Sequence, residues 1–265
     1  MSLTRGVNGC ARNVVSRILR ALIFAGNVVT SHQIFKSLIF LLVLISASSV
    51  FAKDCVVLLH GLARISNSMG ELENKLIEAD FSVANINYSS RKHNIDFLSH
   101  DAVSRGIEEC LETKSEKIHF ITHSLGGILV RFFFEERDLD NLGRVVMLGP
   151  PNQGSELVDR LKPVPGFSLL GPTGSRLGTG ADSILRELGP VFYEVGVIAG
   201  TRNITPLGFF FLNRPNDSVV TVESTKVQGM SDHIILPVTH TFMMRNNMVI
   251  DHSINFLKLG YFIRK

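Results

Sequence analysis

Along residues 54–259, short β-branched runs alternate with longer stretches whose apolar positions recur every three to four residues. Such alternation is typical of a parallel sheet with helices on both faces. The pattern predicts strands at 55–59, 82–88, 117–122, 144–148 and 194–199, and two weaker ones at 219–222 and 233–238. It predicts helices at 95–112, 126–136 and 246–259, and a capping-box pattern at 68–71 predicts another that ends near residue 79. The fold class is therefore α/β, in one domain with a mostly parallel sheet of six or seven strands.

The segment 163–190 interrupts this alternation, because ten of its 28 residues are Gly or Pro. That composition predicts a long irregular connection in place of a plain crossover helix. Long loops at the carboxyl edge of an α/β sheet often carry function. We expect a lid or the wall of a pocket here, and a simple surface excursion is the alternative.

Residues 1–52 contain five basic residues and no acidic one. The apolar or small run 38–52 is shorter than the about 20 residues that a membrane span needs. A basic flank, a short apolar core and small residues before the end are typical of a secretory signal, here cleaved after Ala52. We predict a secreted or periplasmic protein whose folded domain is 53–265. The alternative is a protein anchored in the inner membrane by residues 38–52.

Charge and composition exclude several classes of protein. The chain is 45% apolar and 19% charged, which excludes a disordered or collagen-like chain. Its formal charge of +3 comes from the first 52 residues, since 22 basic residues face 24 acidic ones in the rest. We therefore expect no nucleic-acid partner. No phosphate-binding loop, dinucleotide glycine pattern or Cys/His cluster is present in the sequence, so we expect no cofactor and no metal.

Two cysteines, Cys55 and Cys110, remain after the leader. Cys55 opens the first predicted strand, and Cys110 closes a helix that leads into another strand, so both belong to the same edge of a parallel sheet. In an exported chain this placement predicts a disulfide, and two buried thiols are the alternative.

The candidate chemistry begins at Ser124. The run Thr122-His123-Ser124-Leu125-Gly126-Gly127 stands between a predicted strand and a predicted helix. Strand, tight turn and helix is the context of a nucleophile elbow, in which a strained turn lifts the serine Oγ above the sheet edge. The helix N-terminus also favours a developing anion. The alternative is an ordinary serine N-cap followed by glycines that ease helix packing.

A second motif, His60-Gly61-Leu62, directly follows the strand 55–59. In such an architecture this turn supplies one amide of an oxyanion hole, and the residue after the nucleophile supplies the other. We assign the hole to the backbone N–H groups of Leu62 and Leu125. Taken alone, His60-Gly61 is more typical of a simple turn with a structural histidine.

Two further residues, Asp217 and His240, stand in loops that leave predicted strands. The order Ser124, Asp217, His240 is the order of an α/β-hydrolase triad. His240 would take the serine proton as general base, and Asp217 would fix its tautomer and stabilise the imidazolium. Other side chains compete for these two roles. They are Asp232 and Glu223 for the acid, and His119, His123, His233 and His252 for the base.

Together these motifs resemble small bacterial serine hydrolases of the α/β-hydrolase superfamily, similar to secreted lipases and lipase-like esterases. The resemblance covers 53–261 and rests on VVLLHGLAR (56–64), FITHSLGG (120–127), VVMLGPPNQGSEL (145–157), PNDSVV (215–220) and LPVTHTFMM (236–244). It implies the α/β-hydrolase fold and ester hydrolysis through an acyl-serine intermediate. Thr122 departs from the family, which has a small Gly or Ala there.

The resemblance leaves the substrate open. We expect a small-molecule or lipid acyl ester, a monomer, and contact with a membrane surface as a further option. The run Phe209-Phe210-Phe211-Leu212 predicts a buried strand, with an acyl pocket or a lipid contact as alternatives. The same triad also serves thioesterases, amidases and acyltransferases. From another class, the alternative is a non-catalytic binding protein or envelope chaperone with a hydrolase fold.

Overall fold

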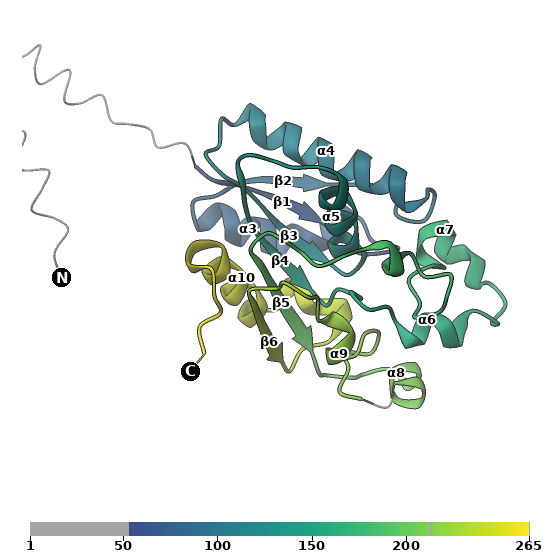
Figure 1. Cartoon of the computed structure of the whole chain (residues 1–265). Coiled ribbons are helices and arrows are strands. Elements are labelled where there is room, and N and C mark those ends of the chain that lie inside the picture. The colour runs from purple at the N-terminus through teal and green to yellow at the C-terminus, as the bar shows by residue number, and fades with distance from the viewer. Residues whose placement is uncertain (1–52, 213, 265) are drawn as a thin grey trace, which may run out of the picture. The chain divides into compact units, whose positions relative to one another are not determined.

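The computed structural model describes residues 53–212 and 214–264. Its centre is a six-stranded, all-parallel sheet with the strand order β2-β1-β3-β4-β5-β6 (Figure 1). The strands are β1 (Cys55–Leu59), β2 (Ser82–Ile86), β3 (Ile118–His123), β4 (Leu142–Leu148), β5 (Val195–Gly200) and β6 (Asp232–Leu236). The predicted fold class, a reduced parallel sheet with six or seven strands, is therefore confirmed.

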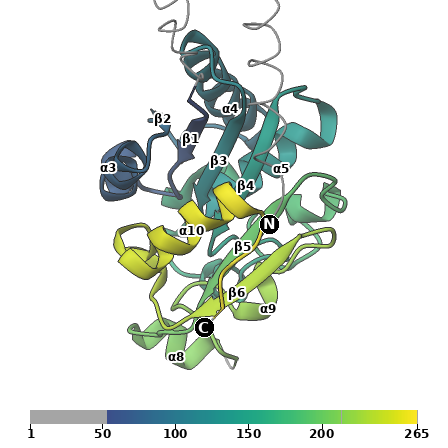
Figure 2. The ribbon, with the colours of Figure 1, turned by 90° about the vertical axis from the view of Figure 1, so that its left-hand side faces the viewer.

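Helices cover both faces of the sheet, as the alternation of apolar side chains along each strand requires. In β1, Val57 and Leu59 pack in one core with α4 (Ile95–Glu112) and α5 (Leu125–Glu136). Val56 and Leu58 point the other way, into a core with α3 (Gly70–Glu78) and α10 (Asn247–Leu259), which crosses the sheet in Figure 2. Burial of both faces explains the nearly continuous apolar strand sequences.

The remaining short elements belong mostly to connections after β1, β4, β5 and β6. They are η1 (Ser66–Met69), α6 (Glu156–Leu161), η2 (Phe167–Leu170), α7 (Gly171–Gly174), η3 (Ile184–Glu187), α8 (Pro206–Phe211), α9 (Val222–Thr225) and η4 (His240–Arg245). The segment 163–190 is irregular, with only η2, α7 and η3 in it. It lies beyond the carboxyl end of β4, together with α6 and α7 (Figure 1).

Three local predictions were wrong. Residues 219–222 form no strand, because they close a tight turn with a single bridge between Asn216 and Thr221. The 209–212 run is no buried strand, since Pro206 begins the helix α8 there. Helix α3 begins at Gly70 without a side-chain cap, because Ser68 Oγ donates to Ile65 O at 2.7 Å.

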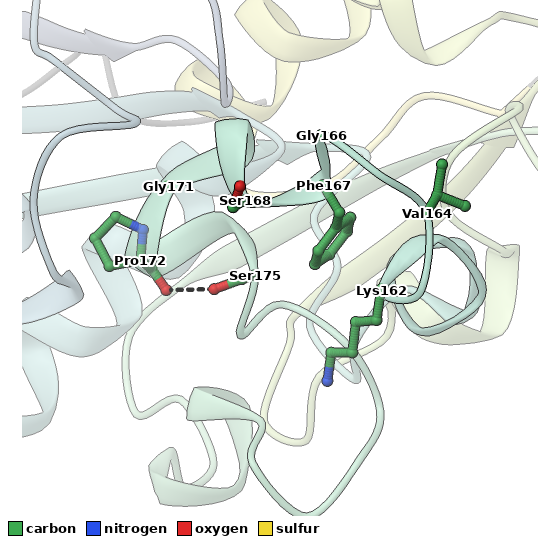
Figure 3. Close-up of a pocket in the computed structure, with 8 residues that line it drawn as sticks. All are labelled: Lys162, Val164, Gly166, Phe167, Ser168, Gly171, Pro172 and Ser175. Atoms are coloured by element: carbon green, nitrogen blue, oxygen red, sulfur yellow. Dashed lines mark hydrogen bonds between the residues drawn. The ribbon is translucent and has the colours of Figure 1, made fainter.

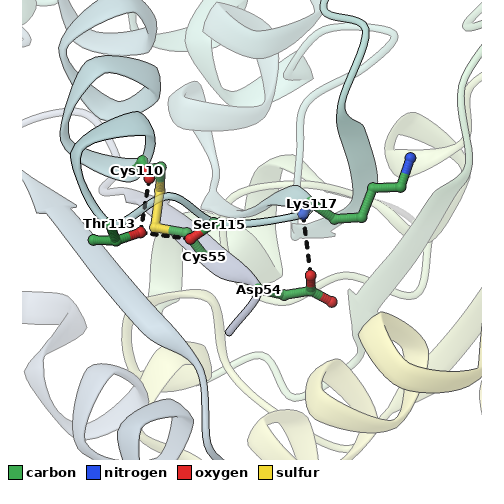
Figure 4. Close-up of a disulfide and its surroundings, with 6 residues drawn as sticks. All are labelled: Asp54, Cys55, Cys110, Thr113, Ser115 and Lys117. Atoms are coloured by element: carbon green, nitrogen blue, oxygen red, sulfur yellow. Dashed lines mark hydrogen bonds between the residues drawn. A yellow bond between two sulfur atoms is a disulfide. The ribbon is translucent and has the colours of Figure 1, made fainter. Parts of the chain in front are cut away.

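A disulfide joins Cys55 to Cys110, with the two Cα atoms 5.5 Å apart (Figure 4). It links the start of β1 to the last turn of α4. The same corner is held by Thr113 Oγ1, which donates to Cys110 O at 2.7 Å, and by Lys117 N, which donates to Asp54 Oδ1 at 3.1 Å. A closed loop of 55 residues is worth about 4 kcal/mol by the chain-entropy estimate.

The predicted leader, 1–52, lies outside the described residues. Among the helices of 53–212 and 214–264, none has the length and apolarity to cross a membrane.

Candidate active site

Ser124 lies on a strained turn between β3 and α5, with φ 53° and ψ −116°. A positive φ is uncommon for a residue with a side chain and persists only where the surroundings hold it. Here the N–H of Ser124 donates to Leu148 O at 2.9 Å, which ties the turn to the end of β4. The Oγ makes no hydrogen bond to any described residue. The serine is thus held by its backbone and its hydroxyl is left free.

Close packing of α5 on the strands explains the glycines after Ser124. A Cβ on Gly126 would lie 2.6 Å from Leu59 O, so only glycine lets the helix approach β1. A Cβ on Gly127 would lie 3.2 Å from Thr122 Oγ1. Thr122 itself is fully buried, and its hydroxyl lies 3.4 Å from Val146 O. The missing side chain of Gly127 therefore makes room for Thr122 where the resemblance expects a smaller residue.

The turn after β1 packs directly against this elbow. A Cβ on Gly61 would lie 2.6 Å from His123 Nδ1 and 3.2 Å from Ser124 Cβ. The N–H of Leu62 donates to no described residue. Leu125 is the first residue of α5, where a backbone N–H has no acceptor in its own helix. The two amides predicted for an oxyanion hole therefore come from segments that meet at Ser124.

Tyr88 packs against the turn after β1. Its ring stacks on the His60 imidazole with centroids 4.0 Å apart, and its hydroxyl donates to His60 O. His60 Nε2 accepts from Tyr88 N at 3.3 Å, so Nδ1 carries the proton and donates to Gly61 O at 2.9 Å. Burial lowers the pKa of His60, which keeps the ring neutral for this arrangement.

Asp217 and His240 are joined twice. His240 Nδ1 lies 2.7 Å from Asp217 Oδ2, and His240 N donates to Asp217 O at 2.9 Å. The other carboxylate oxygen, Oδ1, accepts from Val219 N at 3.0 Å and Val220 N at 2.8 Å. Asp217 is fully buried and His240 is 7% exposed. The carboxylate is thus fixed by three donors, and the imidazole has its Nδ1 proton directed at it.

His123 connects the elbow to His240. Its Nε2 lies 3.0 Å from His240 O, and the two rings lie 4.7 Å apart between centroids. Because a carbonyl can only accept, His123 Nε2 carries a proton and donates it. Burial, and secondarily the neighbouring His240, hold the pKa of His123 well below its usual value. A neutral His123 therefore fastens the residue before Ser124 to the backbone of His240.

Gly149, directly after β4, packs against this pair. Its φ is +53°, and a Cβ there would lie 3.0 Å from Asp217 Oδ2 and 3.1 Å from His240 Nδ1. Any side chain at 149 would compete with the carboxylate–imidazole contact for space.

The competing acids and bases lie elsewhere. Asp232 begins β6 and accepts from Phe262 N and Arg264. Glu223 pairs with Lys226 on the surface. Two of the other histidines have partners of their own, since His119 contacts Asp54 and His233 contacts Thr225 Oγ1. His252 lies on α10. Among the predicted candidates, only Asp217 and His240 share an acid–imidazole contact near the elbow.

The long connection reaches the same region. A Cβ on Gly174 would lie 2.8 Å from Leu62 Cδ2, so α7 packs against the turn after β1. A hollow of about 500 Å³ opens in this connection, lined by Lys162, Val164, Gly166, Phe167, Ser168, Gly171, Pro172 and Ser175 (Figure 3). Ser124 and His240 do not line it. Segment 163–190 therefore contacts the turn after β1 through α7, and its role as a lid, a pocket wall or a surface excursion stays a prediction.

Among the described residues, no group of three or more His, Cys, Asp or Glu side chains is arranged to hold a metal ion.

No protein-family model matches the chain, and no curated protein sequence matches it. Solved structures do. The mature form of Bacillus licheniformis lipase BlEst2 matches with a TM-score of 0.64 and 19% identity, covering 80% of this chain and 93% of that chain. The chain has the α/β-hydrolase fold.

Two other solved hydrolases share it. Phospholipase PlaB from Legionella pneumophila matches with a TM-score of 0.57 and 20% identity, over 76% of this chain and 57% of that chain. Aspergillus fumigatus lipase B matches with a TM-score of 0.58 and 15% identity, over 80% and 55%. The chain thus spans little more than half of these two relatives. Identities this low establish a shared fold, and the activity must be argued from the site.

Ser124 lies on the turn between β3 and α5, where the sequence predicted a nucleophile elbow, and His60-Gly61 lies on the turn that packs against it. Tyr88 and Gly149 were not predicted from the sequence as residues of this site. Tyr88 follows β2, far along the chain from the turn that it holds. Gly149 could have been suspected, because a glycine directly after a buried strand often marks a backbone conformation with positive φ.

Proposed function

We propose that the protein hydrolyses carboxylic esters by a Ser124–His240–Asp217 triad through an acyl-enzyme intermediate. One observation carries the proposal. A serine on a strained turn, with a free hydroxyl, shares the carboxyl edge of the sheet with a buried imidazole whose other nitrogen is held 2.7 Å from a buried carboxylate. That the solved structures with this fold include lipases and an esterase adds support.

In this mechanism His240 Nε2 takes the proton of Ser124 Oγ as the oxygen attacks the ester carbonyl. Asp217 keeps the Nδ1 proton in place and stabilises the imidazolium. The N–H groups of Leu62 and Leu125 donate to the oxyanion of the tetrahedral intermediate, where one such donor contributes about 3 kcal/mol. The imidazolium returns its proton to the leaving alcohol. Water, deprotonated by His240, then attacks the acyl-serine, and the imidazolium returns its proton to Ser124 Oγ as the acid is released.

Thioester or amide cleavage and acyl transfer use the same triad, so the acceptor and the leaving group need measurement. The test is turnover of p-nitrophenyl esters of increasing acyl length by the wild type and by Ser124→Ala. We expect turnover that is lost in Ser124→Ala, whose fold is checked by circular dichroism. Turnover equal in the two proteins, or none in a folded wild type, would leave the non-catalytic binding protein as the better reading.

We also propose that residues 1–52 direct export. The basic flank and the apolar run 38–52 support this, as does the Cys55–Cys110 bond, because disulfides persist in oxidising compartments. The expected product is a mature chain that starts at Lys53 in a periplasmic or culture fraction. A full-length chain in the membrane fraction would favour the anchor instead.

A further inference from the structure

Helix α8 presents an apolar tip that no described segment covers. Phe209 and Phe210 are 74% and 72% exposed, and Phe211 is 37% exposed. Ile204 and Leu207, just before them, are also exposed. Exposed apolar side chains are normal when single, whereas contiguous ones mark an interaction surface. These five residues define the α8 tip.

The α8 tip is held in place by packing and hydrogen bonds. A Cβ on Gly208 would lie 2.8 Å from Ser218 Cα, so the helix sits directly on the loop that carries Asp217. Ser218 Oγ accepts from Ile204 N at 2.9 Å, and Thr205 Oγ1 caps the helix by accepting from Gly208 N at 3.1 Å. The exposed phenylalanines are therefore held outward by an ordered support, next to the acid loop.

The shape of the α8 tip favours contact with lipid acyl chains over contact with the surface of a partner protein. Consecutive residues of a helix point about 100° apart, so Phe209, Phe210 and Phe211 span about 200° around the helix, and the rings of Phe209 and Phe210 pack edge to face with centroids 5.5 Å apart. A partner protein would cover one side of such a projection and leave the others in water. Lipid acyl chains can surround it on all sides. In Figure 1, α8 lies at the outer end of the molecule, beyond the end of β6.

The charge around the tip favours anionic lipid. The segment 202–214 carries two exposed arginines, Arg202 and Arg214, one at each end, and no acidic residue. Arg202 makes no ion pair with a described residue. Arg214 and Phe211 line a surface hollow together with Arg160 and the carboxylates of Glu156 and Asp159, so the charge of Arg214 is partly balanced. Basic side chains that flank inserted aromatic ones are the composition of interfacial segments on anionic membranes.

More apolar side chains lie on the same edge of the sheet. Ile65, Leu169 and Phe242 are exposed, and they follow β1, β4 and β6 respectively. Phe242 is only two residues from His240. The segments that follow these strands thus carry exposed apolar side chains in addition to those of the α8 tip.

From these observations we propose that the α8 tip inserts into a lipid surface that bears anionic headgroups. Docking there would bring the carboxyl edge of the sheet, with Ser124, toward the lipid. That consequence rests on the proposed ester hydrolase function, whereas the binding itself does not.

The test measures partitioning of Ser124→Ala, starting at Lys53, onto sedimented vesicles, so that hydrolysis plays no part. The vesicles are pure phosphatidylcholine or contain 30% phosphatidylglycerol. We expect at least threefold stronger partitioning onto the anionic vesicles. Adding Phe209→Ser and Phe210→Ser should weaken it at least tenfold. The matched control is Phe192→Ser, which removes an exposed phenylalanine before β5, at the opposite edge, and should change it less than twofold.

Three results would overturn the proposal. The first is partitioning within twofold between the double serine variant and its parent. The second is an unchanged preference for anionic vesicles in Arg202→Gln/Arg214→Gln. The third is a dimer that the serine substitutions convert to monomer, which would make a second copy the occupant.

Turnover of p-nitrophenyl butyrate by the Ser124 form of the double variant should stay within twofold of wild type. Absence of that turnover in the wild type contradicts only the proposed function, since vesicle binding is measured separately.

Discussion

Asp217 and His240 are held together by two hydrogen bonds, one between side chains at 2.7 Å and one between backbone groups at 2.9 Å. The second bond aligns the loop after β6 with the acid loop whatever the charge of the imidazole. Because the backbone bond already fixes the distance between the two residues, little side-chain rotation is needed to form the bond between the imidazole and the carboxylate. If His240 is the base, as proposed, its position is therefore set before any substrate arrives.

Asp217→Asn should lower kcat about 10⁴-fold, the size of effect known for loss of charge at a triad aspartate. Asparagine would keep an oxygen toward Val219 N and Val220 N, and its NH₂ would then face His240 Nδ1. That contact requires the proton of the imidazole to sit on Nε2, so His240 could no longer accept from Ser124. Ester turnover measures this. The control is Asp159→Asn, a carboxylate on the same edge that accepts from Thr179, and a loss of equal size there would contradict the assignment.

Gly149→Ala should lower kcat more than it lowers stability. Both Gly149 and Gly166 have positive φ, which costs about 1–2 kcal/mol for alanine. At Gly149 a Cβ would lie within 3.1 Å of both Asp217 Oδ2 and His240 Nδ1, whereas at Gly166 the nearest atom is 3.8 Å away. Urea unfolding should thus show similar losses for Gly149→Ala and Gly166→Ala. If their turnover also falls alike, the crowding at residue 149 has no part in catalysis.

Tyr88→Phe should cost about 1–2 kcal/mol of stability and lower kcat with little change in KM. The substitution keeps the ring stacked on His60. It removes the only donor that the described residues give to the buried His60 carbonyl, in the turn after β1. Chemical denaturation and ester kinetics measure the two effects. Tyr193→Phe is the matched control, because Tyr193 Oη is buried without a partner among the described residues. A Tyr88→Phe enzyme as active and stable as wild type would remove the role of this contact.

Most of the strands and the turn at Ser124 could be predicted from the sequence because both are local. Each strand is a short apolar run, and the Ser124 turn lies within six residues. What the sequence did not indicate depends on contacts between distant segments. Tyr88 meets His60 across 28 residues, and His123 meets His240 across 117. The aromatic run at 209–211 is apolar enough for a strand. It forms an exposed helix because Pro206 begins α8 and because Gly208 packs on Ser218.

Stability should fall as the pH drops below about 6.5. Burial lowers the pKa of His60, His119 and His123, so the unfolded chain binds protons near pH 6.5 that the folded chain does not. The contribution is complete above pH 6.5 and is lost as the pH falls toward the lower folded-state pKa values. Each such group adds a slope of up to about 1.4 kcal/mol per pH unit. Urea unfolding at pH 7.5 and 5.5 measures the slope, which His123→Gln should reduce. A stability that is constant or rises on acidification would contradict the prediction.

The most direct measurement of the central claim is the intact mass of the protein after reaction with a fluorophosphonate. A serine that loses its proton to His240 should react once, at Ser124, and peptide mapping should place the adduct there. Ser124→Ala should remain unlabelled, and His240→Ala should react at least a hundredfold more slowly. A folded wild type that stays unlabelled, or an adduct that persists in Ser124→Ala, would contradict the account.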